Sequence, residues 1–333
     1  MFRKLNLKTL VIILAVLVAI YFIADMVGGN DRTFRSEIVK VDTANVTDIY
    51  ISILKDKAEI RLQKTGGPAD WEVSSAGSSF VADPNIVKNI LAQFTEMKPE
   101  RIAATSKDKW AQFEVSDSTG THVIVKDGNS ELANVYVGKF SYSQPPAQAQ
   151  QQQNPYQQQQ RGKMTSFIRV NKEDEVYAVE GFLKMTYQKD INSYRQKSLV
   201  NVNKDDLTRL VFNYPGFSTF SLIKNDTKWM LDGIVADSAK TAKYLTKIAR
   251  LTSSDFLPPS TSKTSEATYK LTIEGNNISP VEIKAFPAAD TLIKFVVTSS
   301  ANSGAEFNGG KGKLFEKVFV DQTEFLAGEP TQK

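Results

Sequence analysis

An unbroken apolar run close to the N-terminus constrains this chain more than any other feature. It extends from Leu10 to Ala24, and Met26 and Val27 continue it past Asp25. As a helix, residues 9–27 would be about 28 Å long, which matches the roughly 30 Å of hydrocarbon in a bilayer. We therefore predict a transmembrane anchor over residues 9–27, and its apolar side chains include Leu10, Ile13, Leu17, Ile20 and Phe22.

Three cations come before this run, at Arg3, Lys4 and Lys8. Positive charge next to a spanning helix stays in the cytoplasm. Residues 1–8 are thus expected to be cytoplasmic, and the C-terminal body is expected to lie in the periplasm, held at a bacterial inner membrane by a single pass. Two other interpretations remain open, namely a cleaved signal peptide and a buried helix of a soluble protein. A signal peptide would need a shorter apolar region and a better cleavage site than Val27 and Gly29 provide.

Composition excludes several classes of site. The sequence has no cysteine, so disulfides, thiolate zinc sites and cysteine nucleophiles are ruled out. The absence of cysteine is compatible with an exported protein. The net charge is +4, of which +2 comes from the N-terminal segment. Because no broad basic field is left for the body of the chain, we expect no nucleic-acid partner.

The body of the chain compares well with itself. Alternating strand patterns over residues 46–53 and 207–214 are each followed by a second strand and then by a tryptophan, Trp71 or Trp229, at a spacing of 158. A helix is predicted next in each copy. Asp83 and Pro84 have the features of a cap and a first helical residue, and Asp237 is the corresponding cap. The apolar faces are predicted to be Val87, Ile90, Leu91, Phe94 and Met97 in the first helix, and Ala242, Leu245, Ile248 and Leu251 in the second.

Beyond the helices, the same spacing matches residues 123–126 with residues 281–284, and Phe113 with Leu271. The closing segments, 176–183 and 318–326, also look alike. Runs of strands with a single helix are typical of an antiparallel α+β layer. The predicted fold class is therefore α+β, with two tandem copies of an antiparallel sheet that one helix covers, preceded by a single transmembrane helix.

These patterns divide the chain into segments. The expected order is a tether over 28–45, a first α+β repeat over 46–184, a connector over 185–206, a second α+β repeat over 207–328 and a tail over 329–333. The first repeat contains a Gln/Pro-rich loop over 144–162, which has little to bury. This loop is interpreted either as a tolerated surface insertion or as a partner-binding arm, for which Tyr142 and Tyr156 would supply contacts.

The sequence gives little support for catalysis. His122 is the only histidine, and it lies in a predicted strand. No catalytic elbow, dinucleotide fingerprint, phosphate loop or metal-ligand spacing is present, so we expect no enzyme activity, no cofactor and no metal. A hydrolase with an unfamiliar site would need converging carboxylates, for which Asp83, Glu114 and Asp117 are candidates.

The tryptophans are the remaining candidates for a binding surface. Trp71 and Trp229 occupy equivalent places, which favours a role in the two cores. Trp110 has Thr268 as its counterpart, so it is the better candidate for a partner or ligand contact that is specific to the first copy, although packing would also explain it.

Several segments resemble a bacterial envelope domain family of unknown function. They are residues 71–73, the Ala82-Asp-Pro helix start, and the stretch from Arg101 to Val115. The duplicated body and the anchor are similar to that family too. Its members are often encoded beside ABC transporter components similar to those of gliding motility, so the resemblance implies an accessory role in the envelope.

We therefore expect a non-catalytic, membrane-anchored scaffold or docking protein for an envelope complex, such as an ABC-type transport or gliding-like system. The alternatives are an extracytoplasmic module that binds a glycan or a peptide, and a hydrolase with an unrecognised site.

Overall fold

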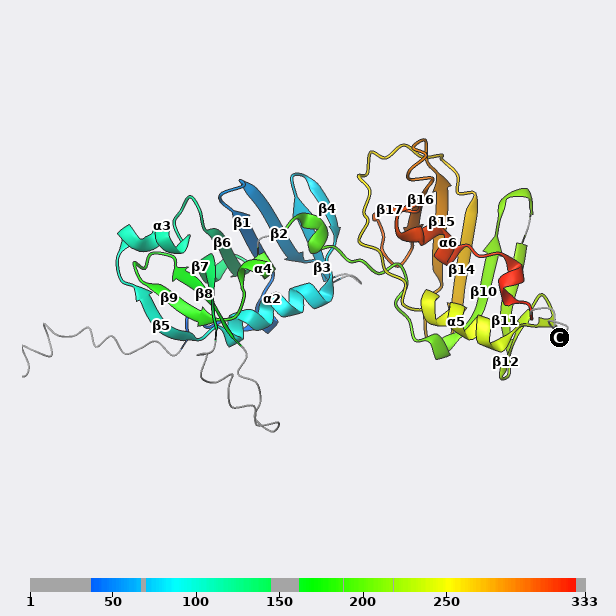
Figure 1. Cartoon of the computed structure of the whole chain (residues 1–333), viewed down its shortest axis with the longest axis horizontal. Coiled ribbons are helices and arrows are strands. Elements are labelled where there is room, and N and C mark those ends of the chain that lie inside the picture. The colour runs from blue at the N-terminus through cyan, green and yellow to red at the C-terminus, as the bar shows by residue number, and fades with distance from the viewer. Residues whose placement is uncertain (1–36, 67–69, 145–161, 188, 218, 328–333) are drawn as a thin grey trace, which may run out of the picture.

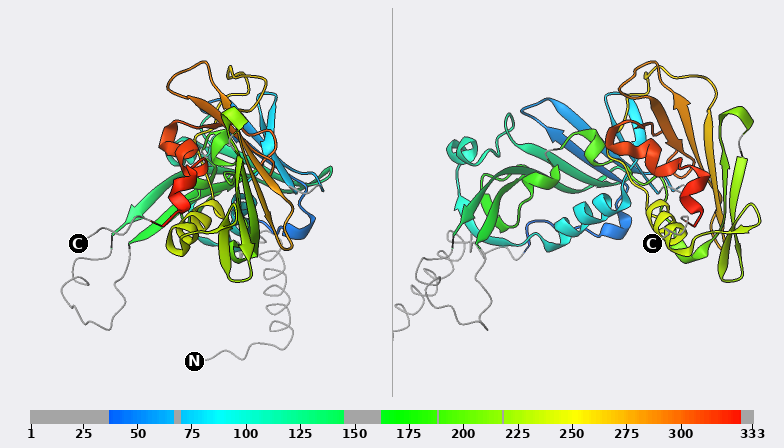
Figure 2. Two further views of the ribbon diagram at one scale, coloured as in Figure 1. Left: turned by 90° about the vertical axis from the view of Figure 1, so that its right-hand side faces the viewer. Right: turned by 45° about the vertical axis from the view of Figure 1, so that its right-hand side comes forward.

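The protein folds into two α+β units that lie end to end and are joined by a single stretch of chain (Figures 1 and 2). The computed structural model describes residues 37–66, 70–144, 162–187, 189–217 and 219–327. Within these ranges, no helix has the length and apolar character needed to cross a bilayer. The predicted anchor over 9–27 and the cations before it lie outside the described residues.

The first unit contains a nine-stranded antiparallel sheet in the order β4-β3-β2-β1-β6-β7-β8-β9-β5. Its strands are β1 (Asp48–Ile53), β2 (Ala58–Lys64), β3 (Trp71–Ser75), β4 (Ser78–Val81), β5 (Pro99–Ala104), β6 (Thr121–Asp127), β7 (Ser130–Ser143), β8 (Lys163–Val170) and β9 (Val176–Glu180). Its helices are η1 (Thr43–Asn45), α2 (Pro84–Glu96), η2 (Lys107–Lys109), α3 (Trp110–Phe113), α4 (Lys184–Tyr187) and η4 (Ile191–Ser193).

The second unit contains an eight-stranded antiparallel sheet in the order β13-β12-β11-β10-β14-β15-β16-β17. Its strands are β10 (Leu207–Asn213), β11 (Thr219–Asn225), β12 (Lys228–Leu231), β13 (Ile234–Val235), β14 (Tyr269–Gly275), β15 (Val281–Pro287), β16 (Phe295–Ser299) and β17 (Phe307–Asn308). Its helices are η5 (Lys204–Asp206), η6 (Pro215–Phe217), α5 (Ser238–Ile248), η7 (Lys311–Lys313), α6 (Leu314–Val318) and η8 (Gln322–Phe325).

The two strand orders confirm the α+β class and the tandem repeat. In each unit, four strands precede the long helix. The first strand of the unit pairs with a strand that comes after the helix, β1 with β6 and β10 with β14, and in the first unit β5 lies between α2 and β6 along the chain. The match at a constant spacing of 158 beyond the helices was wrong. It aligned β6 with β15 instead of β14, and it aligned the helix α3 with β14. A shift by an even number of residues preserves the alternation of apolar and polar side chains, so neighbouring strands look alike in sequence.

The closing segments also differ. Residues 176–180 form strand β9, whereas residues 322–325 form the 3-10 helix η8, so their similarity in sequence does not extend to structure.

Both predicted helix starts are confirmed. Asp83 accepts a hydrogen bond from the Asn85 backbone N–H, and Asp237 accepts one from that of Lys240. A cap of this kind contributes about 1 kcal/mol to stability. Val87, Ile90 and Phe94 of α2 are buried against the first sheet.

In α5, the predicted buried face was partly wrong. Ala242 is exposed, and Tyr244 takes its place beside Leu245 and Ile248. Tyr244 carries a polar oxygen, but this oxygen donates a hydrogen bond to the Val318 carbonyl, and the ring is therefore compatible with burial.

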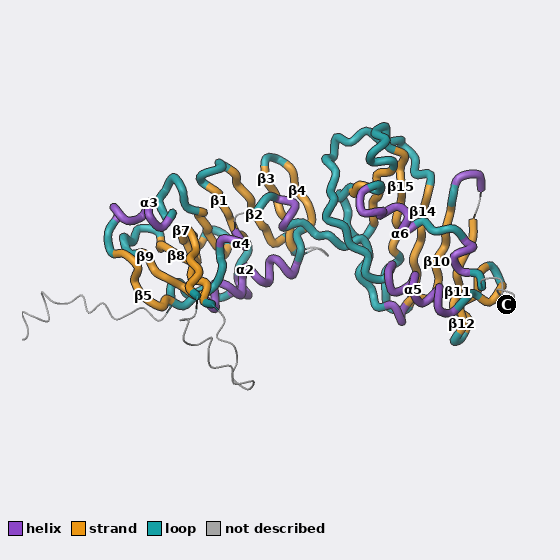
Figure 3. The backbone as a smooth tube through the Cα atoms, in the orientation of Figure 1, coloured by secondary structure: helices purple, strands orange, loops and turns teal. Residues whose placement is uncertain are grey.

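The first unit has a second, smaller core on the far face of its sheet. Ile168 and Phe167 are consecutive in β8 and lie on opposite faces. Ile168 packs in the core beneath α2, and Phe167 packs with Phe113 of α3. Figure 3 shows α2 and α5 as the long helices of the two units, with the shorter helices distributed around the sheets.

The described part of the predicted tether, residues 37–45, and the connector contribute to the cores. Ile38 and Val41, within the predicted tether, are buried in the first core. Tyr187 and Tyr194 of the connector belong to the same core, whereas its Leu199 belongs to the second. The chain therefore passes from one core to the other within about five residues.

Candidate functional site

The link between the units is a short extended segment that forms backbone hydrogen bonds with both units. The Gln196 backbone N–H donates to the Val81 carbonyl of the first unit at 2.8 Å. The next carbonyl, that of Lys197, accepts from the Ser253 N–H of the second unit at 2.9 Å. Because consecutive residues bond to different units, the link constrains how the units are placed.

Arg195 lies at the same junction, and its side chain contacts both units. Its guanidinium carbon lies 3.5 Å from the centre of the Phe80 ring, in the first unit, and 3.8 Å from that of Phe256, in the second. The residue is only 3% exposed, and burial lowers the pKa of its guanidinium to about 10. Its Nη1 donates to Asn192, but Nε and Nη2 have no hydrogen-bond partner among the described residues. Two aromatic faces therefore supply most of the compensation for this buried charge.

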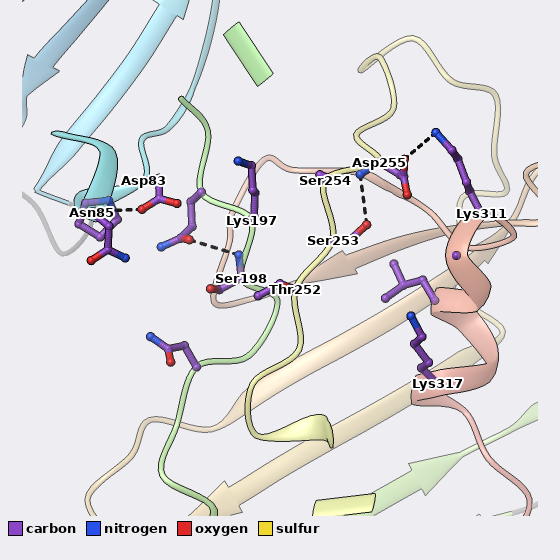
Figure 4. A pocket seen from close by; sticks show the side chains of 15 residues that line it. Asp83, Asn85, Lys197, Ser198, Thr252, Ser253, Ser254, Asp255, Lys311 and Lys317 are labelled. Carbon is purple, nitrogen blue, oxygen red and sulfur yellow. Dashed lines mark hydrogen bonds and ion pairs between the residues drawn. The ribbon is translucent and has the colours of Figure 1, made fainter. Parts of the chain in front are cut away.

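A polar groove opens beside this junction (Figure 4). We call it the interdomain groove, and its volume is about 490 Å³. It is lined by three segments that are distant in sequence: the start of α2, the link, and the loops and helices near α6. The lining residues are Asp83, Pro84, Asn85, Gln196, Lys197, Ser198, Asn201, Thr252, Ser253, Ser254, Asp255, Lys311, Gly312, Leu314 and Lys317.

The lining is rich in hydroxyl, amide and ammonium groups. Lys311 Nζ lies 2.7 Å from Asp255 Oδ1, and Asp83 caps α2, so both carboxylates have partners. Lys197 and Lys317 form no ion pair within the described part of the chain. Three lysines against two aspartates leave the groove with one excess positive charge. Such a lining suits an anionic ligand that also accepts and donates hydrogen bonds.

Trp110, the predicted contact residue, lies elsewhere, in the small core under α3. Its ring lies against Arg169, whose guanidinium carbon is 3.8 Å from the centres of both the Trp110 and Tyr136 rings. Arg169 is 2% exposed and pairs with Asp117 at 2.5 Å. The indole N–H donates to the Asp174 carbonyl. One face of the ring is therefore used for packing.

His122 extends this stack. Its ring is parallel to that of Tyr136 at 4.3 Å, and Nε2 lies 2.6 Å from the Asn134 side-chain oxygen. One continuous stack is therefore formed by Trp110, Arg169, Tyr136 and His122. Burial in this stack raises the pKa of Tyr136 above its usual value.

The other predicted contacts do not join the groove. Tyr142 is the penultimate residue of β7, is 53% exposed and does not line the groove. Tyr156 and residues 145–161 of the Gln-rich loop lie outside the described residues.

The carboxylates considered for a hydrolase are held by separate partners. Glu114 pairs with Lys184, Asp117 pairs with Arg169, and Asp83 caps α2. Among the residues that the structure describes, no group of three or more His, Asp or Glu side chains could hold a metal ion.

A second hollow lies on the open face of the first sheet, and we call it the sheet groove. Its volume is about 650 Å³, and it is bordered by the β3–β4 turn. Tyr50 is one of its lining residues, with Arg61 and Lys126 each near its ring. Six hydroxyl groups line it, contributed by Tyr50, Ser52, Ser74, Ser75, Ser78 and Ser79.

One known family model matches the chain. A family model described as Domain of unknown function (DUF4340) matches residues 71–144 and 158–272, which is more than half of the sequence. The chain belongs to this family. The DUF4340 match begins at β3 and ends in β14, so it contains Phe80, Arg195 and Phe256 and thus the whole junction. Lys311 and Lys317 of the groove lie beyond it. No curated protein and no solved structure matches the chain.

The groove lysines of this DUF4340 chain were not found from sequence. Lys197 lies in a segment interpreted as a connector, and Lys317 lies more than a hundred residues away in a helix of five residues. No local pattern links them. The helix start at Asp83 was visible in the sequence and was interpreted as structural. Asp83 does cap α2, and it also lines the groove.

Proposed function

We propose that this chain is a non-catalytic docking protein of the bacterial envelope. In this proposal, residues 9–27 anchor it in the inner membrane, the two units lie in the periplasm, and the interdomain groove receives an acidic segment of a partner protein. The observation that carries the proposal is the lining of the groove, in which Lys197 and Lys317 are cations without acidic partners among the described residues.

The groove is suited to binding rather than to catalysis. Its hydroxyl groups lie beside amides and ammonium groups, and its two carboxylates are already bonded. An acidic segment would gain charge-assisted hydrogen bonds from both units at once. Because the link and Arg195 fix the relative placement of the units, little ordering would be required when the partner binds, which favours affinity.

The resemblance described above suggests the kind of partner. Members of the envelope family are often encoded beside ABC transporter components, so a periplasmic segment of such a complex is the partner we propose. Domain-level similarity does not by itself identify a function, so the lining of the groove carries the proposal.

A site-directed crosslink tests the proposal. The chain has no cysteine, so Ser254→Cys places a single benzophenone label at the groove in native membranes. We expect one dominant crosslinked protein with an acidic segment at the point of attachment. The double variant Lys197→Glu/Lys317→Glu should abolish the adduct.

Lys243→Glu/Lys247→Glu is the matched control, because it reverses two exposed lysines of α5 in the second unit, outside the groove lining. Equal loss of the adduct in both double variants, or an attachment site without acidic residues, would refute docking at this groove.

A glycan-binding module is the second candidate, and the sheet groove favours it. An aromatic ring in the lining of a hollow rich in hydroxyl groups is suited to stacking and hydrogen bonding with a sugar. Calorimetric titration with peptidoglycan fragments should give binding that Tyr50→Ala abolishes and that Trp229→Phe, in the second unit, preserves. Absence of heat at any fragment concentration would exclude this candidate.

A further inference from the structure

An exposed apolar patch lies at one end of the first unit. Phe140 and Tyr142 of β7 and Met164 of β8 are 38%, 53% and 39% exposed. Among the described residues, they are the large apolar side chains exposed near the end of the β7–β8 hairpin, and we call them the hairpin patch. Isolated exposed apolar residues are common, but adjacent ones mark interaction surfaces.

The three side chains share one face of the hairpin. Tyr142 pairs directly with Met164, and Phe140, two residues earlier in β7, pairs with Ser166. Further along β8 on this face, Ser166 and Ile168 are buried, so the patch continues the core face beyond the point where other elements cover it. Phe182 fixes the Phe140 ring at a centroid distance of 4.1 Å. The patch is therefore part of the folded sheet.

This end of the unit is also where the chain enters it. Lys163, next to Met164, forms ion pairs with Glu100 of β5 and with Glu180. Just before β5, the Met97 carbonyl accepts a hydrogen bond from the Ile38 N–H at 3.5 Å. The hairpin end, the start of β5 and the first described residues of the chain therefore form one neighbourhood.

We propose that the hairpin patch lies in the interfacial region of the membrane, beside the N-terminal anchor. The inference rests on the proposed membrane attachment. Residues 28–36 separate the predicted helix from the first described residue, and nine residues span at most about 30 Å. The patch is thereby held close to the lipid surface at a high effective concentration.

The chemistry of the patch fits that surface. Tyrosine favours the boundary between headgroups and acyl chains, where its ring is buried and its hydroxyl stays hydrated, and phenylalanine adds apolar surface that inserts there. A second copy of the chain or a soluble partner would have to compete with a bilayer in which the same chain is anchored. Contact at the patch gives the first unit a second attachment point, and a tethered body with two attachment points has a defined orientation.

Single-cysteine labelling of the full chain in vesicles tests this. Tyr142→Cys and Met164→Cys each carry a polarity-sensitive fluorophore, and the chain is reconstituted into phosphatidylethanolamine–phosphatidylglycerol vesicles. We expect blue-shifted emission, loss of quenching by aqueous iodide and strong quenching by nitroxide-labelled lipid. Leu292→Cys is the matched control, since Leu292 is an 83% exposed apolar residue of the second unit, and its label should remain open to iodide.

Flotation of the same vesicles distinguishes failure of the patch contact from failure of the N-terminal anchor. If the chain floats with the lipid but labels at 142 and 164 are quenched by iodide as readily as the label at 292, the patch proposal is overturned and the anchor stands. Shielding from iodide without quenching by lipid nitroxide would show that protein covers the patch, and it would also overturn the proposal. A chain that does not float would overturn both proposals.

Discussion

The guanidinium carbon of Arg195 lies 3.8 Å from the centre of the Phe256 ring, and this contact joins the connector to the second unit. Phe80 of the first unit lies on the same guanidinium at 3.5 Å. One buried side chain therefore contacts an aromatic ring from each unit. The same arrangement occurs inside the first unit, where Arg169 lies between Trp110 and Tyr136. Stacked rings hold both buried arginines, but within the described part of the chain Arg169 has a carboxylate partner, Asp117, and Arg195 has none.

Arg195→Ala should uncouple the two units. A desolvated cation–π contact contributes about 2 kcal/mol, so removal of both contacts should weaken the coupling by a few kcal/mol. We expect one calorimetric transition to split into two, together with faster proteolysis near residue 198. Arg195→Lys should restore little, because an ammonium group lacks the planar faces that stack on two rings at once. A single unchanged transition in Arg195→Ala would show that the backbone link alone couples the units.

Tyr187→Phe and Tyr244→Phe should have opposite effects on stability. Both side chains are buried, but the Tyr187 hydroxyl has no hydrogen-bond partner among the described residues, whereas that of Tyr244 donates to Val318 at 2.7 Å. A buried polar group without a partner costs about 1–3 kcal/mol, and a satisfied hydrogen bond contributes about 1 kcal/mol. Urea denaturation should therefore show Tyr187→Phe stabilised and Tyr244→Phe destabilised. Destabilisation of both by the same amount would imply that a water bonds to Tyr187.

Stability should fall at alkaline pH. Burial raises the pKa of four tyrosines in the two cores, Tyr187, Tyr194, Tyr214 and Tyr244. An unfolded tyrosine ionises near pH ~10, so above that pH the unfolded chain binds fewer protons than the folded one. Each tyrosine then lowers the free energy of unfolding by up to about 1.4 kcal/mol per pH unit.

Arg195 acts in the opposite direction, because its pKa is lowered to about 10 and the unfolded chain binds the additional proton above that pH. One group against four leaves a net loss. Urea midpoints measured from neutral to alkaline pH should stay level and then fall steeply. The fall of the urea midpoint with pH should be shallower in Tyr187→Phe than in the unmodified protein. Equal slopes in these two proteins would contradict the raised pKa of Tyr187.

Trp110→Ala should lower the stability of the first unit. The indole covers the buried guanidinium of Arg169 and donates a hydrogen bond to the Asp174 carbonyl. Loss of the ring removes packing and the cation–π contact from the buried Arg169 guanidinium, and we expect the free energy of unfolding to fall by about 2–4 kcal/mol. The control is Trp229→Phe in the second unit, which keeps an aromatic ring in the core. An unchanged urea midpoint for Trp110→Ala would revive the earlier interpretation of Trp110 as a free contact.

Much of the architecture was available from local pattern. Alternation over residues 46–53 and 207–214 predicted β1 and β10, and the Asp-Pro pair at 83–84 predicted the start of α2, because these signals act between residues a few positions apart. The correspondence of later strands was not available. Strand partners are chosen by pairing across the sheet, which the sequence pattern does not record. An alignment of residues 123–126 that is displaced by ten residues, from β14 to β15, matches the same alternation of apolar and polar side chains.

The sequence by itself determined the α+β class, the duplication and the capped helices of this DUF4340 chain, since periodicity and capping depend on neighbouring residues. Only the tertiary structure decided the rest. It placed Arg195 between Phe80 and Phe256, and it brought Lys197 and Lys317 to one groove. It also left Phe140, Tyr142 and Met164 uncovered beside the entry of the chain. These relationships join residues that are distant along the chain, and their energies depend on burial, which a linear pattern does not specify.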